Sequence, residues 1–337
     1  MPRVALPKLF RAHPIETWLV IVLLAISAGL SLTTDQFFTI ANLFNLLNTS
    51  SVNLIFAVGL LVVLISGGID ISFAVAASVV QYVAALSLAG IGGGDWLSGL
   101  TIAALAGIAL GATNAALIYY FRIISIVVTI ATFNIFFGLL MFATRGVSIY
   151  ILPEWWISRT VLLEYQQDNG AWADLTLPVL IMAACVLATW ILIRHTTTGR
   201  QLYAFGDNPE GARRLGINIA AMHFVAYGWL GMMAGIGGFV QVHYAQEVVP
   251  NALVGRELDV LAAVVLGGAR LGGGRGTTLG CVLGVFLVSV TQNGLNLLGV
   301  SPYAFKMIIG SIILVAITLS NAPLTQMLTG LRQRWQS

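Results

Sequence analysis

The stretch "RHTTTGRQLYAFGDNPEGARRLGIN", residues 194–218, lies between two long apolar runs and is the most basic part of the chain. It contains Arg194, Arg200, Arg213 and Arg214. Because arginine and lysine accumulate in the cytoplasmic loops of membrane proteins, this stretch is expected on the cytoplasmic side. It therefore orients all the apolar runs on either side of it.

The 337-residue chain is 58% hydrophobic and 9% charged, with a mean hydropathy of +0.92. An ordinary soluble domain has about 25% charged residues. A membrane-spanning helix uses about 20 apolar residues, so this length leaves room for about ten spans and short loops. The expected fold is an all-α polytopic membrane protein, a single transmembrane domain over residues 1–337 with no soluble catalytic domain.

Basic residues flank the first and last apolar runs. Arg3, Lys8 and Arg11 precede the first run, and Arg332 and Arg334 follow the last. By the same rule both termini are expected in the cytoplasm, which agrees with an even number of spans. The apolar runs predict ten transmembrane helices, at residues 18–33, 48–66, 73–90, 97–121, 124–144, 175–193, 219–240, 258–270, 277–297 and 303–320.

Two longer loops are expected on the opposite, outer side. The first, residues 146–174, holds Trp155, Trp156 and Trp172, which suit the aromatic belt at a membrane surface. The second covers residues 241–257. The 16 lysines and arginines are spread along the chain instead of forming one stripe, so lipid is the expected surrounding and nucleic acid is not an expected partner.

Small residues recur at a spacing of four, which lets helix backbones approach closely in lipid. They are Gly107 and Gly111, Gly231 and Gly235, and Gly276, Gly280 and Gly284. Tight packing of helices is their expected role.

The sequence lacks the patterns of an enzyme. The nearest approach to a phosphate-binding loop, "GGARLGGGRGTT" at 267–278, has no lysine to reach a phosphate. The four histidines are scattered without metal-ligand spacing, and no nucleophile with a base, or pair of carboxylates, is recognisable. We expect neither catalysis nor a metal or cofactor bound by this chain.

The second half of residues 194–218 predicts a short amphipathic helix. Its residues follow the order that helix ends prefer: Asp207 or Asn208 as N-cap, Pro209 at the first position, Glu210 in the first turn, Arg213 and Arg214 late, and Gly216 as the stop. Such a helix either lies at the lipid headgroups or docks onto a partner, and docking is the favoured interpretation.

Five motifs together carry a resemblance to a known family. They are "GGIDIS" at 67–72, "NAALIYYFRIISIVVTIAT" at 114–132, "TTTGRQLYAFGDNPEGARRLGI" at 196–217, "GRELDVLAAVVLGGARLGGGRGTTLG" at 255–280 and "NGLNLLGVSPYAFKMIIGSIIL" at 293–314. In this order and spacing the chain resembles, over nearly its whole length, the permease subunits of ribose-type ABC importers.

The resemblance implies a multi-pass protein of the bacterial inner membrane that moves a monosaccharide or related small polyol. It also implies partners: a second permease subunit, identical or different, a cytoplasmic ABC ATPase that binds ATP and magnesium, and a periplasmic sugar-binding protein. The helix predicted at 207–216 then corresponds to the coupling helix that seats in the ATPase. The chain departs from the family pattern at Phe73, Ala74 and Arg270, which suggests a narrower pathway, an unusual substrate or a heterodimer.

A pathway for uncharged sugars needs groups that both donate and accept hydrogen bonds. The candidates are Gln81, Asn114, Thr129, Asn134 and Asn293. The alternative for each is a hydrogen bond between helices, worth about 0.6 to 2 kcal/mol in membranes.

A second group of residues is expected to break and cap helices: Gly67, Gly68, Asp70, Ser72, Gly267 and Gly268. At the cytoplasmic end of the second and third spans, the glycines permit a break and Asp70 or Ser72 caps the next helix. A salt bridge from Asp70 to Arg270 is a further expectation.

The rival to the importer is an ion-coupled secondary transporter of a small solute, which requires acidic residues inside the membrane. Asp70 is the one acidic residue near the interior of an apolar run. A membrane enzyme is the other rival, and the sequence offers it no catalytic group.

Overall fold

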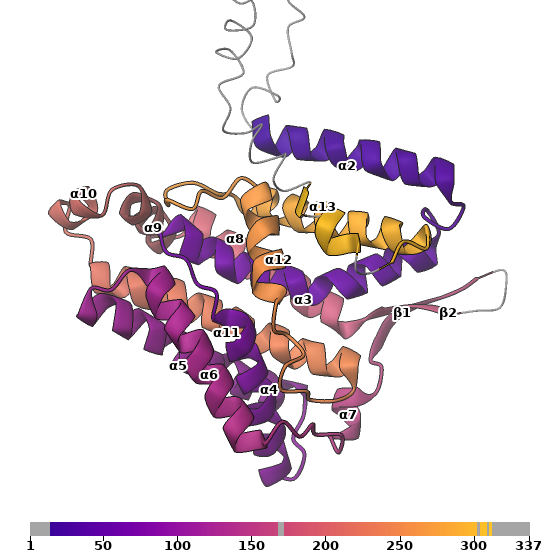
Figure 1. Cartoon of the computed structure of the whole chain (residues 1–337), viewed down its shortest axis with the longest axis horizontal. Helices are drawn as coiled ribbons and strands as arrows, with labels where there is room; N and C mark the ends of the chain where they lie inside the picture. Colours follow the sequence, from indigo (N-terminus) through magenta and orange to yellow (C-terminus); the bar gives the residue numbers. More distant parts are fainter. Residues whose placement is uncertain (1–13, 168–171, 302–303, 309, 312–337) are drawn as a thin grey trace, which may run out of the picture.

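The computed structural model describes residues 14–167, 172–301, 304–308 and 310–311. The chain forms a bundle of helices in which α2 and α13 lie together on one side, α5 and α6 lie on the other, and α3 and α11 run between them (Figure 1). In chain order the elements are α2 (Pro14–Thr33), α3 (Ile40–Ile65), α4 (Phe73–Gly90), α5 (Trp96–Phe121), α6 (Ser125–Thr144), α7 (Glu154–Ile157), β1 (Val161–Gln166), β2 (Trp172–Thr176), α8 (Leu177–His195), α9 (Thr197–Asp207), α10 (Pro209–Arg214), α11 (Ile219–Ala245), α12 (Arg256–Leu266) and α13 (Thr278–Leu297).

Within the described residues, eight helices are long and apolar enough to cross a membrane. They correspond to eight of the predicted spans. The largest shift of a helix end is eight residues, because α3 begins at Ile40 instead of residue 48. The expected all-α polytopic class is confirmed. The last predicted span, 303–320, lies largely outside the described residues. The eight helices are α2, α3, α4, α5, α6, α8, α11 and α13.

The span predicted at 258–270 is wrong in length. Helix α12 has 11 residues, or about 16 Å at 1.5 Å per residue, whereas the hydrocarbon core of a bilayer is about 30 Å thick. The apolar sequence continues past Leu266, but Gly268 adopts a left-handed φ of +90° and ends the helix. Length and hydropathy alone did not reveal this stop.

The segment that leads into α12 is non-helical and is anchored by buried side chains. Val248 and Leu253 have no exposed surface, and the backbone of Val248 exchanges two hydrogen bonds of 3.0 Å with Ile149. Non-helical backbone is tolerated at membrane depth only where protein satisfies its polar groups. The loop expected over 241–257 therefore differs in form, because α11 continues to Ala245 and the following residues fold back against the protein.

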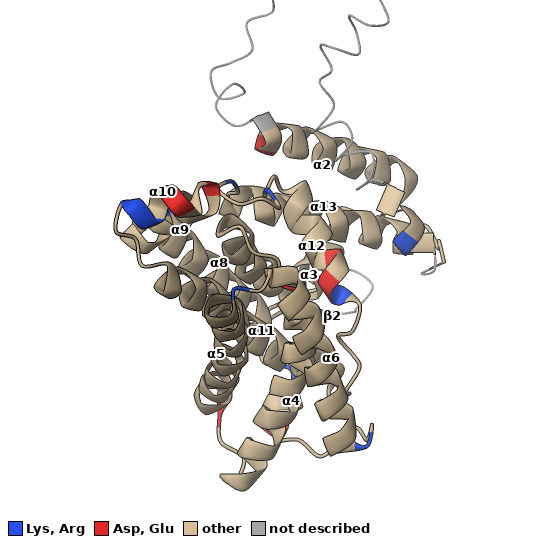
Figure 2. Ribbon diagram, turned by 60° about the vertical axis from the view of Figure 1, so that its left-hand side comes forward, with Lys and Arg blue, Asp and Glu red and all other residues tan. Residues whose placement is uncertain are grey.

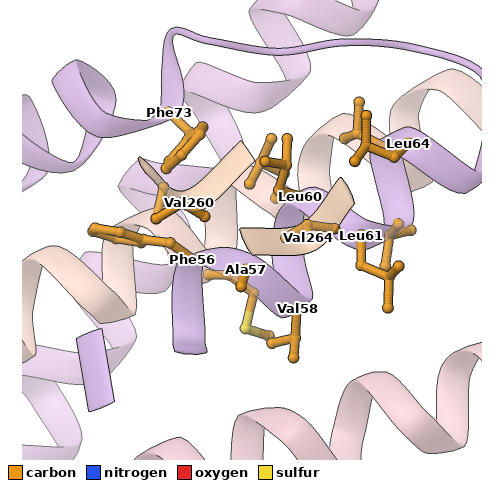
Figure 3. Packing of buried hydrophobic residues seen from close by; sticks show 14 of the residues in the cluster. Phe56, Ala57, Val58, Leu60, Leu61, Leu64, Phe73, Val260 and Val264 are labelled. Atoms are coloured by element: carbon orange, nitrogen blue, oxygen red, sulfur yellow. The ribbon is translucent and has the colours of Figure 1, made fainter. Parts of the chain in front are cut away.

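Helix α3 forms the centre of the hydrophobic core. Its side chains from Val52 to Ile65 are nearly all buried, and Val260 and Val264 of α12 lie against them (Figure 3). Phe73 packs edge-on against Phe56, with ring centroids 5.5 Å apart. Phe73 thus fills the core, and its bulk gives no support to the expectation of a narrowed pathway.

Helices α5 and α11 approach at backbone distance. A Cβ atom on Gly107 would collide with the carbonyl oxygen of Gly231, and one on Gly231 would collide with that of Gly107. Gly111 and Gly235 face backbone of the other helix in the same way. The predicted tight packing at these four glycines is confirmed.

The same kind of contact joins α12 to α13, where Gly280 and Gly284 meet the backbone of Gly267 and Ala263. Gly276 does not take part in this pair, because it lies in the loop before α13 with a φ of +146°.

The loop expected over 146–174 contains more structure than the sequence suggested. Helix α7 follows Pro153, and β1 and β2 pair as an antiparallel hairpin. Trp156 is fully buried, stacks on Phe239 and donates its indole N–H to the Phe239 carbonyl at 3.1 Å. This loop is therefore anchored to the end of α11. We refer to this end of the bundle as the hairpin end.

Two glycines of α11 provide a matched test of the α5–α11 contact. Gly231→Ala is expected to destabilise the protein by about 1–3 kcal/mol because the new methyl group overpacks the contact. Gly228→Ala is the control, since a Cβ there meets nothing within 4 Å. Thermal unfolding of both variants in detergent measures the difference, and equal melting temperatures would contradict the close approach.

Candidate functional site

Helix α10 is an exposed helix with well-formed ends. Asn208 is its N-cap, and the Asn208 side chain accepts a hydrogen bond from the Gly211 N–H at 2.9 Å. Pro209 occupies the first position, and Glu210 pairs with Arg214 at 3.2 Å. Of the two N-caps that the sequence allowed, the structure uses Asn208, because Asp207 is the last residue of α9.

The residues expected at this helix all lie on the surface. Leu215, which sequence reasoning did not single out, is 80% exposed beside them. Figure 2 shows α10 at a corner of the molecule with basic and acidic residues together. Gly216 turns the chain away from α10 with a φ of +79°. The exposed set is Asp207, Asn208, Pro209, Glu210, Arg213, Arg214 and Gly216.

Helix α9 fixes α10 to the bundle. Its Leu202 and Phe205 are buried, and the Tyr203 hydroxyl donates to the Gly276 carbonyl at 2.6 Å. The sequence contained a signal for α9 that was not used: Thr196 caps the helix by accepting from the Gly199 N–H at 3.0 Å. Helix α9 thereby connects α10 to the loop between α12 and α13.

The end of α9 also meets the end of α3. Gly206 lies against the Ile65 carbonyl so closely that no Cβ could be accommodated. The same carbonyl accepts a hydrogen bond from the Gly274 N–H at 2.9 Å. Three segments far apart in the sequence therefore join directly behind α10. We refer to this end of the bundle as the α10 end.

Helices α3 and α12 end in the same way. After α3, the Gly67 N–H donates to Leu64 and the Gly68 N–H to Val63, and Gly67 has a φ of +85°. This is a Schellman motif, which requires a left-handed residue and favours glycine.

After α12, Gly268 takes the left-handed position and donates to Val265, and Ala269 donates to Val264. Gly267 occupies the C-cap position, where its φ is −64° and it closely approaches Gly280. The glycine pairs end these helices.

Asp70 lies in the linker between α3 and α4 and is held by a buried cluster. Its Oδ1 atom accepts from the Ser72 N–H and the Ser72 hydroxyl, both at 2.7 Å. The Asn114 amide of α5 donates to Asp70 Oδ2 at 3.1 Å and to Ser72 Oγ at 2.8 Å. Burial raises the pKa of the Asp70 carboxyl, and these hydrogen bonds oppose that effect.

Of the two expected caps, Asp70 bonds to the start of α4, since its carboxylate accepts from the backbone N–H groups of Ser72 and Phe73. Ser72 occupies the N-cap position of α4, but its side chain makes no capping bond there. Asp70 forms no ion pair with Arg270 among the described residues, and Arg270 is exposed. The predicted salt bridge is therefore wrong. Asp70 instead ties the linker to α5.

The residues proposed to line a pathway bond to different parts of the bundle. Asn114 and Thr129 both hold the linker, since the Thr129 hydroxyl donates to the Ile69 carbonyl at 3.3 Å. Gln81 donates to the Gly238 carbonyl of α11 at 3.0 Å. Asn134 is exposed and donates to Ile130 of its own helix at 2.8 Å.

Asn293 pairs reciprocally with Asn42 of α3. The two amides exchange bonds of 2.8 and 3.0 Å, which join α13 to α3. Gln81 and Asn114 each keep a buried amide oxygen that has no partner among the described residues.

No group of three or more His, Cys, Asp or Glu side chains that could hold a metal ion occurs in the described part of the chain.

Apolar helices of spanning length, with an exposed capped helix at one end and glycine breaks behind it, define a polytopic membrane protein. A family model described as the permease component of branched-chain amino acid transport systems matches residues 42–317, and the chain belongs to that family. A permease component is part of a transport system and not an enzyme by itself.

Curated relatives extend over almost the full chain. The ribose import permease protein RbsC of Escherichia coli (strain K12) is 34% identical, covering 92% of this chain and 97% of the relative. RbsC of Bacillus subtilis (strain 168) is 31% identical over 86% of this chain and 88% of its own. The autoinducer 2 import system permease protein LsrC of Photorhabdus luminescens is 29% identical, with coverage of 90% and 88%. No solved structure matches the chain.

The Asp70 cluster yields a matched pair of variants. Asn114→Leu removes two donors from buried acceptors and is expected to lower the free energy of unfolding by about 1–3 kcal/mol. Asn134→Leu is the control, because Asn134 is exposed and bonds only within its own helix. Thermal unfolding compares the two, and an equal effect would show that the linker does not depend on the cluster.

Proposed function

We propose that the chain is the membrane-spanning permease subunit of an ABC importer for a monosaccharide or a related small polyhydroxylated solute. The observation that carries this proposal is the match to ribose import permeases over 92% of the chain at 34% identity. Another relative, which matches a similar share of the chain, is an autoinducer 2 import system permease. Although the family description names branched-chain amino acids, these full-length relatives favour a sugar-like solute.

The α10 end is proposed to face the cytoplasm. This end carries most of the arginines of the described chain, and such residues remain on the cytoplasmic side. The start of α2 lies at the same end, because Thr277 donates to Glu16 at 2.9 Å. The N-terminus and residues 194–218 are thus proposed to be cytoplasmic, and residues 146–174 periplasmic. The arginines are Arg122, Arg194, Arg200, Arg213, Arg214, Arg270 and Arg275.

Helix α10 is proposed to seat in a cytoplasmic ATPase that binds ATP and magnesium. Its exposed arginines and Leu215 offer charged and apolar contacts, while Gly206 and Tyr203 of α9 connect it to α3 and to the loop before α13. A displacement of α10 by the ATPase would therefore reach both Schellman breaks. The remaining proposed partners are a second permease subunit, a periplasmic sugar-binding protein and the lipid of the bacterial inner membrane.

The alternative is an ion-coupled carrier. In the described residues two acidic side chains are buried: Glu257, which accepts from the Gly255 N–H, and Asp70. The Asp70 carboxylate accepts bonds from Ser72 and Asn114, so it has a structural use that explains its presence. This observation favours the ATP-driven importer.

Charge reversal on α10 tests the docking role. Arg213→Glu together with Arg214→Glu is expected to weaken association with the cognate ATPase at least about tenfold, because repulsion replaces attraction at the contact. Arg145→Glu, at the hairpin end, is the control and should bind as the native chain does. Co-purification from detergent measures binding, and retention of the ATPase by the double variant would refute docking through α10.

The energy source separates the two transport classes. In proteoliposomes containing the assembled complex and the binding protein, uptake of labelled D-ribose is expected to require ATP and to stop with a hydrolysis-deficient ATPase. A proton uncoupler should leave the initial rate unchanged. Uptake that persists without hydrolysis and collapses with the uncoupler would establish the ion-coupled carrier instead.

A further inference from the structure

A cavity of about 420 Å³ opens at the hairpin end between the start of α3, strand β2 and the end of α11. Its volume lies in the range of about 300–1,000 Å³ that small-molecule sites occupy. None of the five residues considered above for a pathway lines it. The cavity is therefore a separate feature of the fold.

The walls are built rigidly. Asn48 of α3 donates to the Asp174 carbonyl at 2.7 Å and accepts from the Thr176 hydroxyl at 2.8 Å. Thr176 in turn contacts the Tyr244 hydroxyl at 3.3 Å. This chain of bonds fixes α3, β2 and α11 relative to one another, so the space between them is preformed.

The lining combines an aromatic face with polar groups that remain free. Trp172 lines the cavity and is 60% exposed. The amide of Asn45 makes no hydrogen bond within the described chain, and Gln246 uses only its Nε2, which donates to the Ile157 carbonyl at 3.2 Å. The face of an indole ring can stack on the C–H groups of a sugar ring. Amides beside the indole can bond to the hydroxyl groups of that ring, since amides both donate and accept hydrogen bonds.

The charge of the lining points to a neutral ligand. Arg159 and Asp174 are its only Arg, Lys, Asp or Glu side chains, and they pair with each other at 3.4 Å. Because the two opposite charges cancel, the lining carries no net charge to attract an anionic headgroup, and an uncharged polyol can bond to the outer atoms of the pair.

From these observations we infer that the permease itself holds a binding site for a monosaccharide-sized polyol at the hairpin end, with Trp172 as the stacking surface and Asn45 as a hydrogen-bonding group. The ligand class rests on the proposed function. Solute released at this end would occupy the site before it moves further.

Direct binding to the isolated permease tests the site. The full chain in phosphatidylcholine nanodiscs, without ATPase or binding protein, is titrated with D-ribose and followed by saturation-transfer difference NMR. Trp172→Leu is expected to weaken binding by up to about tenfold, the loss of one well-stacked aromatic contact. Asn45→Leu should also weaken it, and Trp172→Phe should restore most of the affinity.

Trp190→Leu is the matched control, because Trp190 is a 44% exposed aromatic residue of α8 that lies outside the cavity. It should bind D-ribose as the native chain does, and all variants should show native melting temperatures. Absence of saturable binding, or equal affinity of Trp172→Leu and Trp190→Leu, would overturn the site. So would displacement of D-ribose by phosphatidylglycerol in the nanodisc, which would assign the cavity to a lipid headgroup.

The binding experiment and the uptake experiment can fail independently of each other. ATP-dependent uptake by the assembled complex, with no D-ribose binding to the permease alone, would reject this site and leave the proposed function standing. Binding without ATP-dependent uptake would retain the site and reject the importer.

Discussion

The close approach of α5 and α11 is the constraint on which the rest of the bundle depends. Lipid tails are as apolar as leucine, so helices in a membrane are held by packing and hydrogen bonds more than by the hydrophobic effect. Gly107 and Gly231 allow two backbones to touch without intervening side chains. Helix α11 then packs on α3 and α4, and α5 brings Asn114 to the linker that contains Asp70. Both the core and the linker are positioned by this one contact.

A second consequence of the membrane environment is that breaks in helices must be satisfied by protein. The α3–α4 linker and the loop after α12 both begin with Schellman turns, and both lie beside Gly206 at the end of α9. Glycines provide the left-handed conformations and the space, while Ser72, Asn114 and Ser125 bond to the linker. The exposed helix α10 is thus attached to the two places where the bundle is least regular. This arrangement suits a protein in which an event at α10 must reach the interior.

Much of the architecture was predictable. Eight spans, the exposed helix at residues 209–214 and the packing glycines follow from runs, spacings and cap residues that are local in the sequence. The roles of the buried amides were not predictable in the same way. Asn293 looked like a pathway group because polar residues are rare in apolar helices, yet its partner, Asn42, is 251 residues away. An amide that pairs across a bundle and an amide that faces a solute have the same local sequence signal.

The sequence by itself determined that this chain is a polytopic membrane protein, where eight of its spanning helices lie, and where a charged, capped helix interrupts them. These properties depend on composition and on neighbours within one or two helical turns. The tertiary structure alone decided that the segment before α12 pairs with Ile149 through Val248, that Asp70 bonds to α5, and that α3, β2 and α11 enclose a cavity. Each of these depends on which groups meet across the bundle, because the hydrogen bonds and close contacts join residues that are distant in the chain.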